Sequence, residues 1–207
     1  MEEKTKRVGI MGGTFNPIHL GHMLVGQCAA ESYNLDEILL VPCGKSHMKD
    51  IKLDAKTRIS MIGEGIQDNS TFALSTIEVD REGYSYSYET IKELKTKNPT
   101  TEYFFIVGAD TLMKMDQWKN PDKIFSEVTV LVAARIGVSH DDLLARIEEI
   151  KVKYPGAKVE ILPINCVDIS STQIRNKVRE GKSIRYMVHY KVIEYINKNH
   201  IYQDEEV

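Results

Sequence analysis

The 207-residue sequence has little cysteine, no long apolar run and no excess of positive charge. Its three cysteines are widely spaced and form no CxxC pair. This excludes a disulfide framework and a four-cysteine zinc site, and it favours reduced thiols in a cytoplasm. The longest apolar runs, residues 103–107 and 128–134, are too short to span a bilayer, so we expect no membrane segment. The charged N-terminus enters only a short apolar run, so we expect no signal peptide.

The charge balance argues against nucleic acid as a general partner. Lysine and arginine number 27 and aspartate and glutamate number 30, which gives a formal net charge of −3. General nucleic-acid binders usually carry a basic excess instead.

Short β-rich runs alternate with longer helical patterns, which predicts an α/β fold with a doubly wound parallel sheet. We expect one domain over residues 1–207, with a small helical part from about residue 170 packed on the sheet. Ligands of such sheets bind beyond the carboxyl ends of the strands. Strands are predicted at residues 7–11, 37–41, 72–79, 103–107, 128–133 and 159–162, and helices at residues 20–33, 55–67, 88–97, 141–153, 171–180 and 189–199.

The strongest chemical signal is residues 12–22 (GGTFNPIHLGH), which follow the first predicted strand and open the first helix. Gly12 and Gly13 let a ligand approach the backbone closely. The helix that follows offers unpaired N–H groups and the positive end of its dipole, which suit a phosphate. His19 and His22 are three residues apart and share one helical face, so both rings can donate to phosphoryl oxygens.

Two plainer interpretations of this segment stay open. Asn16 and Pro17 make a good N-cap and first helical residue, so the segment could be only a well-capped helix start. The two histidines could also share a metal ion. No carboxylate or cysteine nearby completes a ligand set, so we expect no metal site built from side chains.

Residues 12–22 resemble the signature of the HxGH nucleotidyltransferase superfamily, whose members transfer a nucleotidyl group from a nucleoside triphosphate. A second segment, residues 169–175 (ISSTQIR), resembles the ISSTxIR motif of the same superfamily. On its own it could be a capping box, because Ser170 and Gln173 have the required spacing. A helix start that also carries hydroxyls and Arg175 suits a polyphosphate.

Within the superfamily, the rest of the chain resembles the bacterial nicotinate mononucleotide adenylyltransferases. The resemblance covers essentially the whole chain and implies a Rossmann-like nucleotidyltransferase fold. It rests on residues 41–45 (VPCGK), 58–61 (RISM), 78–90 (EVDREGYSYSYET) and 105–110 (FIVGAD), and on Trp118.

The chain departs from this family pattern at three places. Asn16 stands where many members have aspartate, and Ser87 and Glu89 replace threonine and aspartate. The loop at residues 46–49 (SHMK) lacks the frequent Pro-Pro-His-Lys, so either His47 or Met48 takes the histidine position, while Lys49 matches.

The resemblance implies an enzyme of NAD biosynthesis. It would join ATP and nicotinate mononucleotide to give deamido-NAD and pyrophosphate, with Mg²⁺ accompanying ATP. The mononucleotide phosphate is dianionic above a second pKa of about 6 and needs no general base, so we expect direct in-line transfer without a covalent intermediate.

The resemblance also implies roles for single residues. His19, His22 and Arg175 would be catalytic. ATP would contact Gly12, Gly13, Thr14, Phe15, Gly108, Asp110, Ile169, Ser170, Ser171 and Thr172, and phosphate would contact Lys45 and Lys49. The nicotinate nucleotide would contact Asn16, Tyr86, Ser87, Trp118 and Arg135.

Two other functions stay open. One is a related nucleotidyltransferase with another acceptor, such as nicotinamide mononucleotide, phosphopantetheine or a phospho-alcohol. The other is a non-catalytic nucleotide-binding regulator, against which the intact His19, His22 and Arg175 argue. The sequence also leaves a homo-oligomer open.

Overall fold

A computed structural model of the chain describes residues 5–45, 51–134, 137–164 and 168–203. Its strands form one six-stranded sheet in the order β3-β2-β1-β4-β5-β6, and every pairing is parallel. β1 and β4 are neighbours in space but not in sequence, so the strand order reverses between them. This confirms the predicted doubly wound fold. The strands are β1 (Arg7–Gly13), β2 (Glu37–Pro42), β3 (Phe72–Leu74), β4 (Glu102–Gly108), β5 (Thr129–Ala133) and β6 (Lys158–Ile161).

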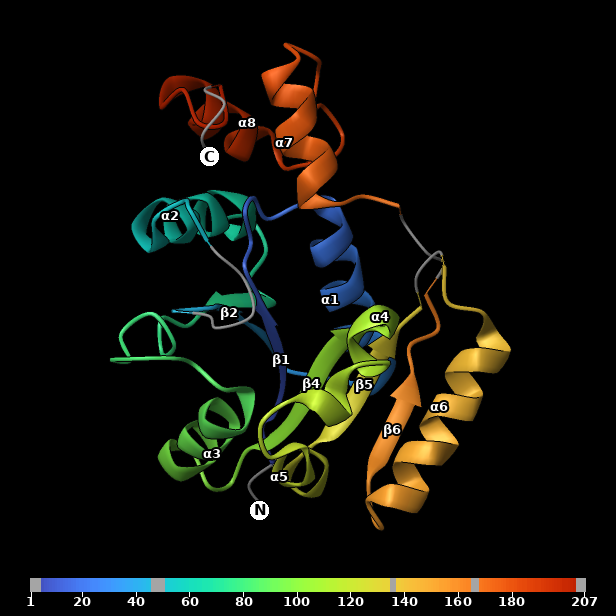
Figure 1. Cartoon of the computed structure of the whole chain (residues 1–207). Coiled ribbons are helices and arrows are strands. Elements are labelled where there is room, and N and C mark those ends of the chain that lie inside the picture. Colours follow the sequence, from blue (N-terminus) through green and yellow to red (C-terminus); the bar gives the residue numbers. More distant parts are fainter. Residues whose placement is uncertain (1–4, 46–50, 135–136, 165–167, 204–207) are drawn as a thin grey trace.

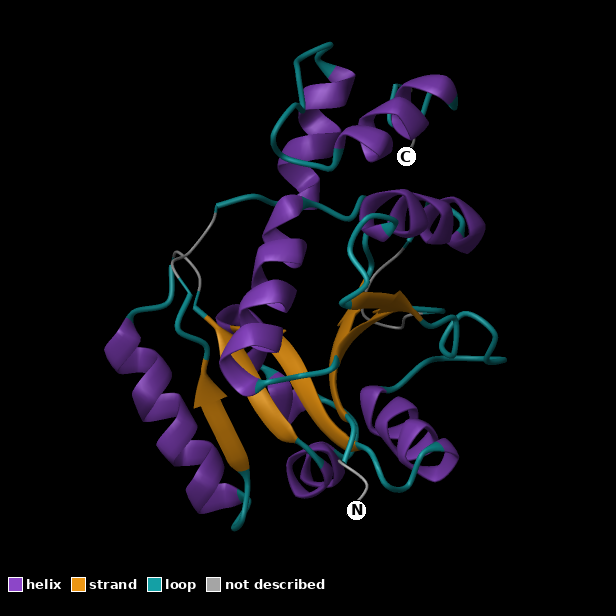
Figure 2. Cartoon of the chain, turned by 180° about the vertical axis from the view of Figure 1, so that it is seen from behind, coloured by secondary structure: helices purple, strands orange, loops and turns teal. Residues whose placement is uncertain are grey.

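Helices cover both faces of the sheet (Figures 1 and 2). Successive strand residues point to opposite faces, so Met11 joins the core under α1 and α2, whereas Ile10 joins the core under α3, α5 and α6. The helices are α1 (Leu20–Tyr33), α2 (Ala55–Ile66), α3 (Ser87–Lys97), α4 (Ala109–Leu112), α5 (Pro121–Glu127), α6 (His140–Lys153), α7 (Ser171–Arg179) and α8 (Tyr190–Lys198), with a 3₁₀ turn, η1 (Met115–Gln117). Within the described ranges, none is long and apolar enough to cross a membrane.

The helices α7 and α8 lie beyond the carboxyl ends of the strands (Figure 1). α8 packs against α2. Ile174 of α7 and Val192 and Ile196 of α8 are fully buried and belong to the same core as α1 and α2. The C-terminal helices therefore stand over the edge of the sheet where ligands of this fold bind.

One expectation about the elements was wrong, and one helix was not expected. The predicted strand at residues 72–79 ends at Leu74, because the chain turns away after the bond from Ser75 N–H to the Leu40 carbonyl. The next residues form a turn in which the hydroxyl of Thr76 donates to Asp80. α5 was not predicted, although Pro121 stands at its first turn, because seven residues are too few for a clear helical period.

A packing prediction follows from Gly26 in α1. A Cβ at this position would approach Cε1 of the buried Phe72 to 2.6 Å. We expect Gly26→Ala to lower the free energy of unfolding by about 1–3 kcal/mol, because the ring and the helix must move apart. Gly63→Ala in α2 is the matched control. Its Cβ would meet nothing within 4 Å, so we expect a gain of up to about 1 kcal/mol from helix propensity. Urea unfolding compares the two, and an equal effect at both sites would contradict the packing argument.

Candidate active site

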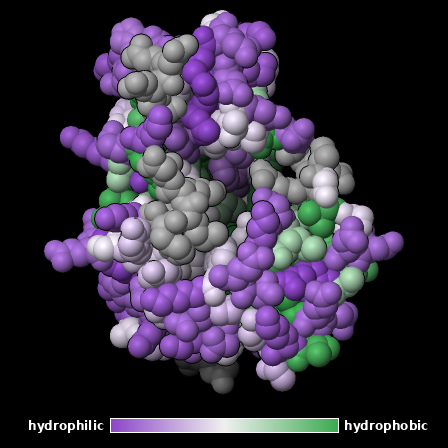
Figure 3. Space-filling model, in the orientation of Figure 1, coloured by the Kyte–Doolittle hydropathy of each residue, from purple (hydrophilic) through white to green (hydrophobic). Residues whose placement is uncertain are grey.

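A cavity of about 910 Å³ lies at the carboxyl ends of the strands, where β1 and β4 are neighbours. Its walls come from the turn after β1, the start of α4, the loop before α3 and the start of α7. The space-filling view is hollowed between the C-terminal helices and the body of the protein (Figure 3). The position and the volume are those of a small-molecule site in this class of fold.

The turn between β1 and α1 forms one wall. α1 begins at Leu20 with His19 as its N-cap, so the interpretation of Asn16 and Pro17 as the cap of this helix is wrong. Phe15 has a positive φ of 51°, uncommon for a large side chain, and it is only 2% exposed. Burial of its ring beneath Gly13 compensates for that conformation and anchors the turn.

The two motif histidines lie together at the end of this turn. Their rings stack with centroids 3.6 Å apart, and both line the cavity. The backbone N–H of His19 donates to Nδ1 of His22 at 3.2 Å. A ring nitrogen that accepts carries no hydrogen, so the neutral His22 ring holds its hydrogen on Nε2. The fold therefore selects the tautomer in which Nε2 is a donor.

The second motif docks directly onto the first. The hydroxyl of Ser171 donates to the Pro17 carbonyl at 2.9 Å, and Nη1 of Arg175 donates to the Asn16 carbonyl at 2.8 Å. Ser170 and Gln173 form the capping box of α7, as their spacing predicts. The second motif is therefore both a capping box and a contact with the first motif. The start of α7 forms part of the cavity wall.

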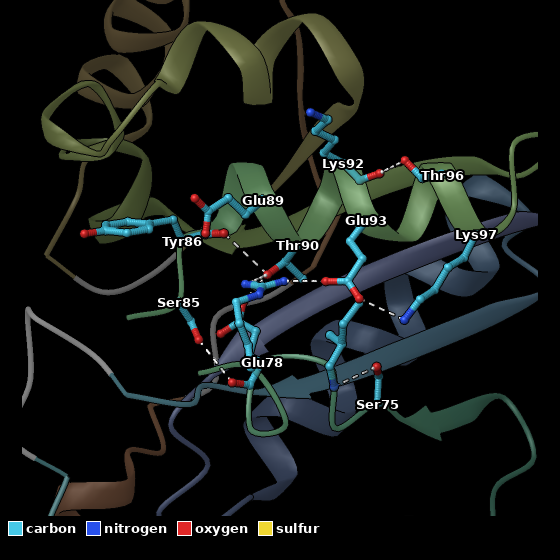
Figure 4. Close-up of polar contacts among 12 residues, drawn as sticks. Ser75, Glu78, Ser85, Tyr86, Glu89, Thr90, Lys92, Glu93, Thr96 and Lys97 are labelled. Atoms are coloured by element: carbon cyan, nitrogen blue, oxygen red, sulfur yellow. Dashed lines mark hydrogen bonds and ion pairs between the residues drawn. The ribbon is translucent and has the colours of Figure 1, made fainter. Parts of the chain in front are cut away.

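The opposite wall is a loop that packs onto the end of β2. Ser85 N–H donates to the Lys45 carbonyl at 3.0 Å, and the Ser85 hydroxyl donates to the Glu78 carbonyl at 3.1 Å (Figure 4). A Cβ at Gly44 would collide with the main-chain oxygen of Glu78, so this approach requires glycine. These contacts place Tyr86, which begins the turn into α3, at the cavity.

A buried carboxyl group supports this loop. The Glu78 carboxylate accepts from the Thr90 hydroxyl at 2.8 Å. The same hydroxyl lies 3.4 Å from the carbonyl oxygen of Tyr86 (Figure 4). Burial raises the pKa of the Glu78 carboxyl above its ordinary value, against the opposing effects of Thr90, Arg81 and the Gly44 N–H. The Arg81 guanidinium in turn forms an ion pair with Glu93 of α3 at 2.8 Å.

The structure brings the predicted site residues together, with three exceptions. Ser170 is occupied in the capping box and does not line the cavity. Lys49 and Arg135 lie outside the described residues, as does His47. The cavity wall contains Gly12, Gly13, Thr14, Phe15, Asn16, His19, His22, Lys45, Tyr86, Ser87, Gly108, Asp110, Trp118, Ile169, Ser171, Thr172 and Arg175.

Sequence reasoning missed the charged residues Glu78, Lys114 and Lys119 of the wall. Lys119 Nζ lies 4.2 Å from the centroid of the Tyr86 ring. The neighbouring Trp118 meets Phe105 edge-on, with centroids 6.3 Å apart. A lysine beside an aromatic residue is common on surfaces, so the signal for Lys119 was only its adjacency to Trp118.

Comparison with known proteins decides between the families that this geometry allows. Residues 10–177 match the cytidylyltransferase-like family. The chain is 38% identical over 199 residues to a probable nicotinate-nucleotide adenylyltransferase of Lachnoclostridium phytofermentans, covering 95% of this chain and 99% of that protein. It is 39% identical over 204 residues to one of Clostridium beijerinckii, covering 96% and 100%. The chain belongs to the nicotinate-nucleotide adenylyltransferase family. This confirms the family resemblance of its motifs.

Solved structures share the fold of this family member. The nicotinic acid mononucleotide adenylyltransferase of Plasmodium falciparum complexed with NaAD superposes with a TM-score of 0.76 at 21% identity, over 95% of this chain and 97% of that one. The same enzyme complexed with APC gives a TM-score of 0.75. The two proteins therefore share their fold although most of their side chains differ.

The floor of the cavity depends on a buried arginine, which generates a stability prediction. Arg58 of α2 is 2% exposed and donates to the carbonyls of Thr14 and Cys43, each at 2.9 Å. It thereby ties the end of β1 to the end of β2. We expect Arg58→Lys to lower the free energy of unfolding by about 2–3 kcal/mol, because one ammonium nitrogen replaces the two guanidinium nitrogens that reach the two carbonyls separately, and one carbonyl loses its well-placed donor.

Arg179→Lys is the matched control, because Arg179 donates to Asn176 in an exposed position. It should change stability by less than about 0.5 kcal/mol. Urea unfolding measures both variants, and a similar small change in both would show that Arg58 does not bridge the strands.

Proposed function

We propose that the chain transfers the adenylyl group of ATP to nicotinate mononucleotide, forming NaAD and pyrophosphate for NAD biosynthesis. The observation that carries this is the closure of both motifs on one cavity, through the bond of 2.8 Å from Arg175 to the Asn16 carbonyl. The whole chain, residues 1–207, would act as one domain. Family membership supports the choice of substrates.

The chemistry would be an in-line displacement at the α-phosphorus of ATP. An oxygen of the mononucleotide phosphate forms the new P–O bond, and the bond to pyrophosphate breaks with its electron pair on the leaving oxygen. The attacking phosphate is already a dianion above a pKa of about 6, so neither a general base nor an enzyme nucleophile is required. The protein then has to position both substrates and stabilise charge on the phosphoryl oxygens.

The cavity residues suit that task. His19 and His22 present imidazole donors to the α- and β-phosphate oxygens, and the Nε2 hydrogen of His22 is oriented by the bond at Nδ1. Arg175 uses two of its nitrogens on Asn16 and Thr172. A guanidinium has five N–H donors, so Arg175 keeps donors for the triphosphate as well.

Mg²⁺ enters this proposal as part of the ATP substrate. Among the residues that the structure describes, no cluster of three or more histidine, cysteine, aspartate or glutamate side chains could hold a metal ion. Mg²⁺ keeps several waters and commonly binds substrate phosphates. The donor set therefore fits an ion held mainly by the triphosphate and water.

The end of the cavity proposed for the acceptor has features that suit a nicotinate ring, which carries a negatively charged carboxylate. α3 begins at Ser87, and the first N–H groups of a helix have no partner within it. Such N–H groups near Ser87 would bind the nicotinate carboxylate. The main-chain N–H of Trp118 donates to the Met115 carbonyl, so this residue would contribute its ring. Lys119 adds a positive charge over Tyr86, and Trp118 offers a ring for stacking on the pyridine.

We also infer a reducing, cytoplasmic location. Cys28 and Cys43 are free thiols in the structure, and reduced thiols are typical of that compartment.

A pyrophosphate-release assay with a panel of acceptors tests the proposed function. Nicotinate mononucleotide, nicotinamide mononucleotide, phosphopantetheine and a phospho-alcohol would each be offered with ATP and Mg²⁺. We expect the fastest release with nicotinate mononucleotide. Release with phosphopantetheine alone would indicate a related transferase, and ATP binding without any release would indicate a regulator.

The mechanism predicts a specific kinetic effect at His22. We expect His22→Ala to lower kcat at least about 100-fold, the scale for removing one transition-state donor. The Kd for ATP should change much less, because the interaction strengthens mainly in the transition state. Steady-state kinetics and ATP titration measure the two effects.

His189→Ala is the control for His22→Ala. His189 contacts Asp68 at 3.2 Å and is not part of the cavity wall. We expect its kcat to stay near that of the unaltered protein. A His22 variant with unchanged kcat would remove this ring from the mechanism.

The acceptor pocket predicts a preference for the acid over the amide. A pocket of N–H donors satisfies a carboxylate but leaves the amide NH₂ of nicotinamide facing another donor. Such a mismatch can reach about 10⁴-fold in kcat/KM. We expect nicotinate mononucleotide to be favoured in kcat/KM at saturating ATP, and equal values would contradict the pocket assignment.

Two lysine variants test whether the positive charge of Lys119 contributes to the preference for the acid. Lys119→Gln should lower the ratio of acid to amide kcat/KM about twofold to fivefold, the scale of an exposed ion pair. Lys123→Gln is its matched control, because Lys123 lies over Tyr88 at 5.3 Å and outside the cavity wall. The control should leave the ratio unchanged.

A further inference from the structure

A tyrosine from the far end of the described chain reaches the turn that carries the first motif. Tyr202 follows α8, is 1% exposed and donates its hydroxyl to Oδ1 of Asn16 at 2.6 Å, across 186 residues of sequence. Its φ is +67°, and that of His200 is +52°. The left-handed region is unfavourable for a large residue, so the packing of Tyr202 holds the chain in a conformation that it would otherwise leave.

We propose that Tyr202 is a positioning residue for the acceptor nucleotide, because its hydroxyl orients the Asn16 carboxamide. A carboxamide has an acceptor end and a donor end, and a hydroxyl that donates to Oδ1 turns Nδ2 the other way. Asn16 lines the cavity. Its NH₂ group is thereby presented to an oxygen of the mononucleotide, which is the substrate under the proposed function.

The surroundings of Tyr202 keep its hydroxyl a donor. Burial raises the pKa of Tyr202, so the group retains its hydrogen throughout the neutral range. The other contact of the hydroxyl is Sδ of Met61 at 3.8 Å, a weak acceptor that does not compete with Oδ1. Within the described part of the chain, Nδ2 of Asn16 makes no hydrogen bond of its own.

The turn does not need Tyr202 merely to hold its shape. Arg58, Arg175 and Ser171 already bind its main-chain carbonyls at Thr14, Asn16 and Pro17. Tyr202 instead binds a side-chain atom of a residue in the cavity wall. Such a bond governs the direction of a polar group rather than the path of the backbone.

Tyr202→Phe tests this inference because it removes the hydroxyl and keeps the ring. We expect kcat/KM for nicotinate mononucleotide to fall about fivefold to tenfold, the effect of one hydrogen bond. The KM for ATP should stay within about twofold. Tyr103→Phe is the matched control. Tyr103 is 5% exposed, and its hydroxyl donates to the Leu94 carbonyl away from the cavity. It should lose some stability and keep its kinetics.

An Asn16→Ala background separates orientation from general support. Without a carboxamide to orient, Tyr202→Phe should cause no further loss in kcat/KM or in the Kd of nicotinate mononucleotide measured by calorimetry. The same loss in both backgrounds would mean that Tyr202 only supports the fold and would overturn the inference. Unchanged acceptor kinetics in Tyr202→Phe would also overturn it.

A measurement on the unaltered protein covers the case in which Tyr202→Phe does not fold. The side-chain NH₂ signals of Asn16 in an ¹⁵N-labelled sample, assigned by their loss in Asn16→Ala, should shift when nicotinate mononucleotide is added. Signals that stay in place while the mononucleotide binds would overturn the inference. A protein that neither binds this mononucleotide nor releases pyrophosphate would overturn the proposed function with it, whereas an active protein with unaffected variants would overturn the inference alone.

Discussion

The hydrogen bond from Arg175 to the carbonyl of Asn16 joins segments that are 159 residues apart, and the site depends on it. A parallel sheet gathers its loops at one edge but does not order them. Without α7, the carbonyl oxygens of Asn16 and Pro17 would lack their donors, in the part of the cavity to which the proposed function assigns the triphosphate. Ser171 and Arg175 cover both oxygens with donors. The docking therefore removes negative ends from the wall and brings positive charge to it.

A main-chain hydrogen bond also orients one of the motif histidines. His22 receives a backbone N–H at Nδ1, so its tautomer is set before any ligand arrives. A Cβ at position 21 would lie 3.0 Å from Nδ1 of His19, so glycine between the two histidines in the sequence leaves room for the His19 ring. A donor that is already oriented needs no reorientation during the reaction. Water molecules would have to reorient around the developing charge, and this reorganisation costs free energy.

The sequence predicted the elements with strong local signals. The bounds of α1 at residues 20–33 agree in full, because a long apolar pattern ends at a residue that adopts the left-handed conformation, Asn34. The strand at 72–79 was too long because its alternation continues into a polar turn, and α5 was too short to show a period. Most of the cavity wall followed from resemblance to family motifs. No role in the site was predicted for Glu78, Lys119 or Tyr202, because only the tertiary structure brings Glu78 and Lys119 into the cavity wall and Tyr202 into contact with Asn16.

The contact with Tyr202 can orient the side chain at position 16 because this side chain is a carboxamide, a departure from the family pattern. A carboxylate, which many members carry at this position, has two equivalent oxygens and no orientation to choose. A carboxamide has two unlike ends, and a half-turn about its last bond exchanges a donor for an acceptor at the cavity. A chain with asparagine in this wall needs a partner that distinguishes the ends. The buried hydroxyl of Tyr202 does so, because its other contact among the described residues is the weak acceptor Sδ of Met61, and its hydrogen is therefore donated to Oδ1.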